Sequence, residues 1–227
     1  RANMRTFERR RDDFGLTDRY TYDSTYRVVR TELDQEGLPG AQARDLQRLA
    51  YAYDGVGNRR QLDRTAASTG LATDTFTVNV MNEYDAINGV ARVHDDNGNL
   101  TDDGTRSMVY DHRNRLIEVR DKTSDNLIAR YFYLADNRRS RKVVFSRTLP
   151  GTVEKETAFF YDGWQEVEET DASGTWKKRY LYGEGIDEVL RAEIVGADTL
   201  YYHQNSIGSV VAVTKDSGEV KESYRYS

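Results

Sequence analysis

The sequence predicts an all-β protein made of repeated antiparallel β-hairpins that form a curved or spiralling strip of sheet. A tyrosine-aspartate phrase recurs along the 227 residues, and residues typical of tight turns follow most copies. Short runs rich in β-branched and aromatic residues separate the turns, as in Ser209–Thr214. The chain has only two prolines and 11% aromatic residues, which is not the composition of a disordered segment.

The repeated phrase is Tyr-x-Tyr-Asp, followed after two further residues by Gly or Asn and then by Arg or Asn. Its clearest copy runs from Tyr51 to Arg59. Side chains alternate along a strand, so both tyrosine rings of a copy project from one face. The predicted structural repeat positions are Tyr22, Asp23, Tyr53, Asp54, Gly57, Tyr84, Asp85, Asp95, Gly98, Tyr110, Asp111, Tyr133, Tyr161, Asp162, Tyr182, Tyr202 and Gly208.

The aspartate is expected to end a strand and to bond backbone amides two residues further on. Gly and Asn tolerate the positive φ that tight hairpin turns require. The interval between copies runs from 20 residues (Tyr182 to Tyr202) to 31 residues (Tyr22 to Tyr53). Each interval holds one hairpin, so the strip contains about nine hairpins.

Three stretches depart from this pattern. Leu46 and Leu49 are three residues apart, so a short helix or helical turn between Gly40 and Tyr51 stays open as an alternative to a strand. Tyr26 replaces the Gly of the first copy and Leu134 replaces the Asp of a later one. We expect these two turns to be distorted.

The predicted organisation is a basic segment or the end of a preceding repeat over residues 1–18, followed by a repeat array over residues 19–227. The chain does not begin with Met and stops inside a repeat near Tyr226, which indicates a fragment of a longer polypeptide. The net charge of −5 argues against nucleic-acid binding. No apolar run is long enough to cross a membrane, so we expect no membrane insertion by this segment. The absence of cysteine excludes disulfides and Cys-ligated metals.

We predict no catalytic, cofactor or metal site, and no enzymatic activity. His94, His112 and His203 lack ligand partners at zinc spacing, and two of them stand in or beside tyrosine positions. The acidic run Asp95–Asn99 fails the EF-hand pattern, because Leu100 stands where that loop needs Gly. It is therefore expected to be a turn rather than a calcium site.

Two further site chemistries were weighed against a structural role. Glu166, Glu168 and Glu169 lie on one strand, whereas a glycosidase places its two acids on separate elements across a cleft. No Gly-x-Ser-x-Gly phrase of a serine hydrolase is present. Trp164, Trp176 and the tyrosine rows could stack on sugars, but cross-strand packing of rings explains them as well.

Several phrases resemble the YD or RHS repeat family, which includes toxin-complex C subunits and teneurins. The resemblance covers roughly residues 19–227 and is carried by Asp96–Thr101, Tyr161–Trp164, Tyr180–Gly183 and Ser206–Val210. It implies a sheet that spirals into a hollow shell holding a C-terminal toxin. The Asp-Pro-x-Gly phrases of the family's self-cleaving core are absent, so no cleavage residue is carried over.

The resemblance implies a structural scaffold segment that encloses or presents a polypeptide cargo such as a C-terminal toxin. The expected partners are other parts of the same polypeptide, with a secreted or cell-surface location. Two alternatives stay open. One is an extracellular interaction module that binds glycans or cell surfaces, and the other is a β-fibre subunit that self-associates through strand edges.

Overall fold

The computed structural model describes residues 5–11, 16–35, 45–66 and 69–224. The prediction of an all-β fold is confirmed, because these residues form strands joined by turns and contain no helix. Asp45–Tyr53 is a strand, so the helical alternative is wrong there, and its first residues, 40–44, lie outside the described part. Parts of the basic segment (1–4 and 12–15) and the last repeat copy (225–227) also lie outside it.

The chain divides into two compact units, Arg1–Gly104 and Thr105–Ser227. The first contains β1 (Arg5–Arg11), β2 (Leu16–Tyr22), β3 (Val28–Gln35), β4 (Asp45–Tyr53), β5 (Arg59–Ala66), β6 (Gly70–Val78), β7 (Tyr84–Ile87), β8 (Val90–Ala91), β9 (Val93–His94) and β10 (Leu100–Asp102). The second contains β11 (Arg106–Tyr110), β12 (Leu116–Asp121), β13 (Leu127–Tyr133), β14 (Arg139–Phe145), β15 (Val153–Asp162), β16 (Gln165–Thr170), β17 (Trp176–Tyr182), β18 (Val189–Ile194), β19 (Leu200–Gln204), β20 (Val210–Lys215) and β21 (Val220–Ser223).

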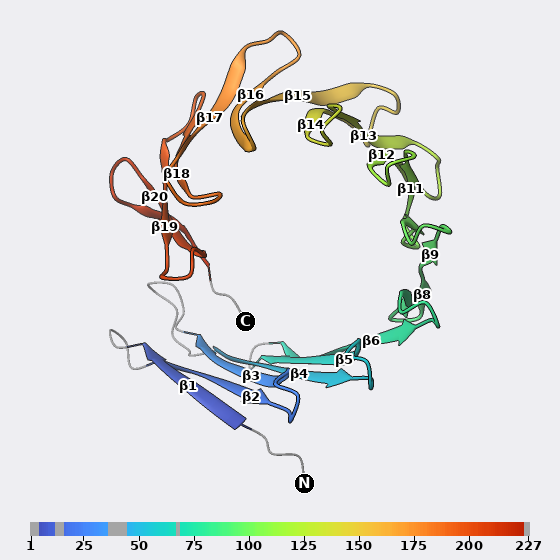
Figure 1. Cartoon of the computed structure of the whole chain (residues 1–227), viewed down its shortest axis with the longest axis vertical. Helices are drawn as coiled ribbons and strands as arrows, with labels where there is room; N and C mark the ends of the chain where they lie inside the picture. Colours follow the sequence, from blue (N-terminus) through green and yellow to red (C-terminus); the bar gives the residue numbers. More distant parts are fainter. Residues whose placement is uncertain (1–4, 12–15, 36–44, 67–68, 225–227) are drawn as a thin grey trace. The chain divides into compact units, whose positions relative to one another are not determined.

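Within each unit the strands lie side by side in sequence order. β1 to β8 form one antiparallel sheet, and β11 to β21 follow one another in the same way, as the colours of Figure 1 trace. β9 and β10 form a short antiparallel pair in the first unit. Because sequence neighbours pair antiparallel within β1–β8 and within β11–β21, successive turns in each of these runs alternate between the two edges of a sheet. We call the edge with the turns 23–27, 54–58 and 79–83 in the first unit, and 111–115, 134–138, 163–164, 183–188 and 205–209 in the second, the tyrosine edge.

Most hairpins of this edge share one five-residue turn. In the first copy the Asp23 N–H donates to the Arg27 carbonyl (2.9 Å) and the Tyr26 N–H to the Asp23 carbonyl (3.1 Å). The fourth residue has positive φ, for example 102° at Gly57 and 58° at Asn114. This is a three-residue loop closed by a residue in the left-handed region with an adjoining bulge. The same pair of bonds occurs at this edge in the turns that begin at Asp54, Asn79, Asp111, Leu134 and Asn205, and elsewhere in the turns that begin at Asp95, Asp171 and Lys215.

The expectation of distorted turns at Tyr26 and Leu134 is wrong for their hydrogen bonding. Tyr26 adopts φ of 63° and keeps both turn bonds. At Leu134 the backbone bonds are also kept (2.8 Å to Arg138), and Asp136 takes over the contact with the Arg138 guanidinium. The backbone turn is therefore set mainly by the residue of positive φ, and Asn137 supplies it here.

The sheets bury few side chains. The buried apolar side chains among the described residues all lie on strands and are Leu49, Val119, Ala129, Val143, Phe145, Phe159, Ala192, Leu200 and Val213. Thr31, Thr157 and Thr170 are buried with them. This agrees with the low apolar content of 37%, since a thin sheet has no large central core.

Candidate functional site

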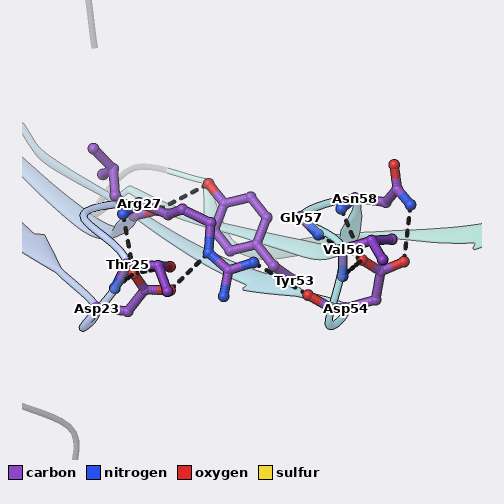
Figure 2. A network of polar contacts seen from close by, with 9 residues as sticks. Asp23, Thr25, Arg27, Tyr53, Asp54, Val56, Gly57 and Asn58 are labelled. Carbon is purple, nitrogen blue, oxygen red and sulfur yellow. Dashed lines mark hydrogen bonds and ion pairs between the residues drawn. The ribbon is translucent and has the colours of Figure 1, made fainter.

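The repeat positions come together at the tyrosine edge in a polar network that joins one hairpin to the next. In Figure 2, Asp23 and Arg27 of one turn face Tyr53 and Asp54 of the following turn. We call this set of contacts a clasp. It consists of an aspartate, the arginine four residues later, and the tyrosine of the next repeat.

The aspartate of the clasp closes its own turn. Asp23 accepts hydrogen bonds from the Thr25 N–H (2.9 Å), the Arg27 N–H (3.0 Å) and Arg27 Nε (2.8 Å). Partial desolvation acts to raise its pKa, but the hydrogen bonds from Arg27 and Thr25 outweigh it and hold the pKa well below the usual value. The carboxylate therefore stays ionised and fixes the direction of the arginine.

The arginine then reaches the next repeat. The Arg27 guanidinium lies 5.0 Å from the centroid of the Tyr53 ring, and its Nη1 donates to the Asp54 carbonyl (3.1 Å). In return, the Tyr53 hydroxyl donates to the Val28 carbonyl (2.8 Å), next to Arg27. Burial raises the pKa of Tyr53, so the hydroxyl remains a donor. The two hairpins are thus tied in both directions.

The second unit repeats the clasp. Arg115 lies 4.9 Å from the Tyr133 ring centroid and donates to the Leu134 carbonyl (3.1 Å). The Tyr133 hydroxyl donates a hydrogen bond to the Leu116 carbonyl (2.8 Å). Arg138 lies 4.9 Å from the Tyr161 ring centroid and donates to the Gly163 carbonyl. The hydroxyls of Tyr161 and Tyr182 donate to the carbonyls of Arg139 and Glu166, both at 2.8 Å.

Several other predicted positions are located in these turns. Asp54, Asp95 and Asp111 each accept bonds from the N–H groups two and four residues later. Gly57, Gly98 and Gly208 have positive φ. Tyr22 and Tyr110 precede their turns, at the ends of β2 and β11. The arginine four residues after the aspartate is part of the repeated phrase, but nothing in the phrase itself points to its contact with the tyrosine of the next repeat.

Other predicted positions differ from the sequence assignment. Tyr84 and Asp85 begin β7, because the turn lies earlier, at Asn79–Glu83. Tyr202 lies two residues too early, since Gln204 directly precedes the turn at Asn205. Asp162 pairs with Gln165 across a two-residue turn whose Gly163 has φ of 57°.

The residues considered above as metal or catalytic ligands have structural contacts instead. Asp95 accepts three bonds from Asn97 and Asn99, so the acidic run is a closed turn. His203 Nε2 lies 2.8 Å from the Thr214 hydroxyl. In the described part of the chain, no group of three His, Asp or Glu side chains could hold a metal ion.

The glutamates of β16 differ in environment. Glu168 pairs with Arg179 (2.6 Å), and Glu169 accepts from the Tyr180 hydroxyl (2.8 Å). Glu166 is half-buried, and burial together with the nearby Glu169 raises its pKa. An open cleft of about 570 Å³ lies near the edge opposite the tyrosine edge. Its lining includes Thr157, Thr170 and Lys177. Lys177 is paired with Asp171 there (2.8 Å).

The fold and the clasps define the class of protein as a hairpin-repeat wall. In such a wall a thin antiparallel sheet is built from repeated hairpins, and contacts along one edge join each hairpin to the next. Two solved structures have this fold. The Photorhabdus luminescens Tc holotoxin pore matches 93% of this chain and 11% of its own chain, with a TM-score of 0.61 and 18% identity. The TcdB2-TccC3-Cdc42 complex matches 96% of this chain and 12% of its own, with a TM-score of 0.64 and 17% identity.

Curated relatives agree with that class. The tRNA3(Ser)-specific nuclease WapA of Bacillus spizizenii is 32% identical over 180 residues, which is 78% of this chain and 7% of the relative. The tRNA nuclease WapA of Bacillus subtilis strain 168 is 30% identical over the same shares. No family model matches the chain. Together the comparisons support an RHS-type repeat protein, and the chain spans a small part of the relatives it matches.

These relatives correct one prediction. We expected no enzymatic activity, but the relatives are named tRNA nucleases. The expectation drew on the missing motifs and on the repeat pattern, and neither reports on the activity of a protein many times longer than this chain. The names of these relatives also argue against the prediction that the protein has no nucleic-acid partner.

Proposed function

We propose that this chain is a segment of a YD-type RHS wall in a longer, secreted or cell-surface toxin protein, and that the wall encloses a polypeptide cargo with nuclease activity. The observation that carries the proposal is the clasp, because it ties consecutive hairpins into a continuous sheet without a large core. Such a sheet can extend by adding hairpins, as repeat architectures do.

The array would begin before residue 19. β1 pairs with β2 from Arg5↔Tyr22 to Arg11↔Leu16, so residues 5–11 belong to the same sheet. This favours the end of a preceding repeat over a separate basic segment. The proposed partners are therefore the neighbouring repeats of the same polypeptide and the cargo.

The cargo proposal is tested by limited proteolysis of the full-length protein. We expect its C-terminal domain to be digested more slowly than the same domain produced alone. Arg27→Ala should speed digestion by opening a clasp, whereas Arg60→Ala, an exposed neighbour on β5, should not. Equal digestion of the free and the enclosed domain would overturn the proposal.

The nuclease proposal is tested separately with tRNA. Cleavage by the full-length protein and not by residues 1–227 would assign the activity to another segment. Cleavage by residues 1–227 that disappears in Glu166→Gln, but not in Glu168→Gln, would place it in the wall. No cleavage by the full-length protein would refute the nuclease cargo.

A further inference from the structure

One arginine of the first unit is held by aromatic rings and has no acidic partner. The Arg59 guanidinium lies 5.3 Å from the Tyr51 ring centroid and 5.6 Å from the Phe76 ring centroid. Its Nε is buried without a hydrogen-bond acceptor, and no carboxylate in the described ranges forms an ion pair with it. By contrast, Arg64 on the same strand is paired with Asp74 (2.6 Å). A half-buried guanidinium without an acceptor is costly, so its position requires an explanation.

The neighbours of this arginine lie on one face of the sheet. Residues directly opposite each other in an antiparallel pair share a face, and Tyr53 pairs with Arg59 while Val78 pairs with Tyr84. The Phe76 ring, two residues before Val78, also lies 5.4 Å from the Tyr84 ring. It therefore connects the arginine to the tyrosine two strands away. We call this set the Arg59 cluster, and it consists of Tyr51, Arg59, Phe76 and Tyr84.

The second unit has an arginine at the same position of the repeat, but with a carboxylate on its face of the sheet. Arg139 pairs with Tyr133, as Arg59 pairs with the tyrosine before its own turn. Its guanidinium lies 4.4 Å from the Phe159 ring centroid, and its Nε also lacks an acceptor. Burial raises the pKa of Glu166, and the positive charge of Arg139 counteracts that rise. Glu166 therefore serves as the counter-charge of Arg139 across β15.

An uncharged residue occupies the corresponding position in the first unit. Glu166 lies on β16, two strands beyond Arg139, and pairs with the tyrosine near the end of β15. Tyr84 lies on β7, two strands beyond Arg59, and pairs with the last residue of β6. The two positions are equivalent in the repeat. Arg59 therefore lacks the counter-charge that Arg139 has.

We infer that the Arg59 cluster binds an oxyanion, a carboxylate or phosphate group of another molecule, in the role that Glu166 has beside Arg139. The planar fork of a guanidinium suits both groups, and stacking on rings orients it in advance. Val78 stands where other repeats have tyrosine, so the side chain beside Arg59 is smaller there. A single partly exposed guanidinium supports a dissociation constant on the order of 1 mM. This inference does not depend on the proposed cargo or nuclease function.

The test follows the arginine Nε–Hε resonances by NMR while inorganic phosphate or acetate is added to the 227-residue chain at neutral pH. We expect one resonance, absent in Arg59→Gln, to shift saturably at concentrations on the order of 1 mM. Sodium chloride at matched ionic strength controls for screening and should not reproduce the shift. Arg60→Gln, at an exposed neighbour on the same strand, should leave the shift unchanged.

Two exchanges between the units test the role of the missing carboxylate. Tyr84→Glu supplies it within the chain and should weaken binding of the added anion by about tenfold or more, whereas the uncharged Tyr84→Gln should not. Tyr84 is 37% exposed, so both variants should keep their strands, which circular dichroism would verify. Conversely, Glu166→Gln removes the counter-charge of Arg139 and should create a second saturable shift, at the Arg139 resonance.

The two probes also distinguish the sources of the oxyanion. Tighter binding of phosphate than of acetate would indicate a ligand that carries phosphate groups, and the reverse order would indicate the carboxylates of a polypeptide. Either order supports the site. No saturable shift, an equal shift with chloride, or equal weakening by Tyr84→Glu and Tyr84→Gln would overturn the inference. An Arg139 resonance that ignores both probes in Glu166→Gln would contradict the equivalence on which it rests.

Discussion

Replacing Arg27 by alanine tests whether the clasp stabilises the first unit. The substitution removes the guanidinium 5.0 Å from the Tyr53 ring centroid and the donor to the Asp54 carbonyl (3.1 Å). Asp23 keeps its bonds from Thr25 and from the backbone of residue 27. The turn itself should therefore survive, and the loss should fall on the contact between hairpins.

The magnitude follows from the two lost contacts. A partly exposed cation–π contact contributes about 0.5–1 kcal/mol, and the hydrogen bond contributes about 1 kcal/mol. The Arg27 side chain is 34% exposed, so the ion pair with Asp23 adds little more. We expect the free energy of unfolding to fall by about 1–2 kcal/mol, which lowers the Tm of a unit of about 100 residues by roughly 4–16 °C.

The assay is urea unfolding followed by circular dichroism, with hydrogen exchange to locate the change in the first unit. Arg60→Ala is the control, because Arg60 is exposed on the same sheet and should change stability by less than about 0.5 kcal/mol. Combining Arg27→Ala with Tyr53→Leu, which removes the ring under the Arg27 guanidinium, should give less than the sum of the two losses, because both variants delete the same contact. Equal effects of Arg27→Ala and Arg60→Ala, or full additivity with Tyr53→Leu, would refute the clasp.

Three further predictions concern pH and turn geometry. Hydrogen bonds from Arg115 hold the pKa of Asp111 at about 2, below its unfolded value near 3.8, so its stabilising contribution is present above pH 3.8 and is lost as the pH falls toward 2. Asp111→Asn should make thermal unfolding less sensitive to pH over that window, and an unchanged pH profile would contradict this. Burial raises the pKa of Glu166, so the folded chain holds its proton more tightly and loses stability as the pH rises above about 4.5. Glu166→Gln should flatten that part of the Tm profile, whereas Glu168→Gln, which removes the partner of Arg179, should not. A Cβ at Gly183 would lie 2.2 Å from Glu188 Oε2, so Gly183→Ala should displace the carboxylate from the Gly185 N–H and lower stability by about 1 kcal/mol. Gly55→Ala meets no atom within 4 Å and should be neutral in the same urea titration, and equal losses would refute the steric argument.

The sequence predicted the hairpins where tyrosine, aspartate and a residue of positive φ occur together. Tyr53, Asp54 and Gly57 give the strand end, the cap and the left-handed residue, and these are local requirements. The turn at Asn79 was missed because Val78 stands in the tyrosine position and Asn79 replaces the aspartate. Asn79 Oδ1 nevertheless accepts from the N–H groups of Met81 and Glu83, as an aspartate would.

The error at Tyr84 has a related cause. Tyr84 and Asp85 are followed by Asn88, which imitates the repeat spacing, and Asn88 does have positive φ (53°). It belongs, however, to a two-residue turn with Gly89 at the opposite edge, where Ile87 pairs with Val90. Local sequence identifies a residue that can turn, but strand pairing decides which edge the turn belongs to.

Contacts between hairpins could not be derived from one repeat phrase. The reach of Arg27 to Tyr53 depends on two strands lying between the turns, which only the sheet order establishes. The fifth turn residue is Arg in the turns that begin at Asp23, Asp111 and Leu134, but Asn58 in the second copy. Asn58 Nδ2 bonds Asp54 (3.0 Å) and reaches Asn82 Oδ1 of the next turn (2.5 Å). A short amide pair thus replaces the arginine and its ring contact.

This exchange indicates what the wall requires at its tyrosine edge. With few buried side chains, a sheet that is one layer thick gains little from a core, and each hairpin contacts mainly its sequence neighbours. Stability must then come in part from the contacts that join neighbouring turns along the edge. Arginine over tyrosine and amide on amide differ in chemistry, yet both connect a turn to the one two strands away. The position of the contact, rather than the identity of its residues, is therefore what the repeats share, and this is why hairpins with different turn residues can still be joined within a sheet.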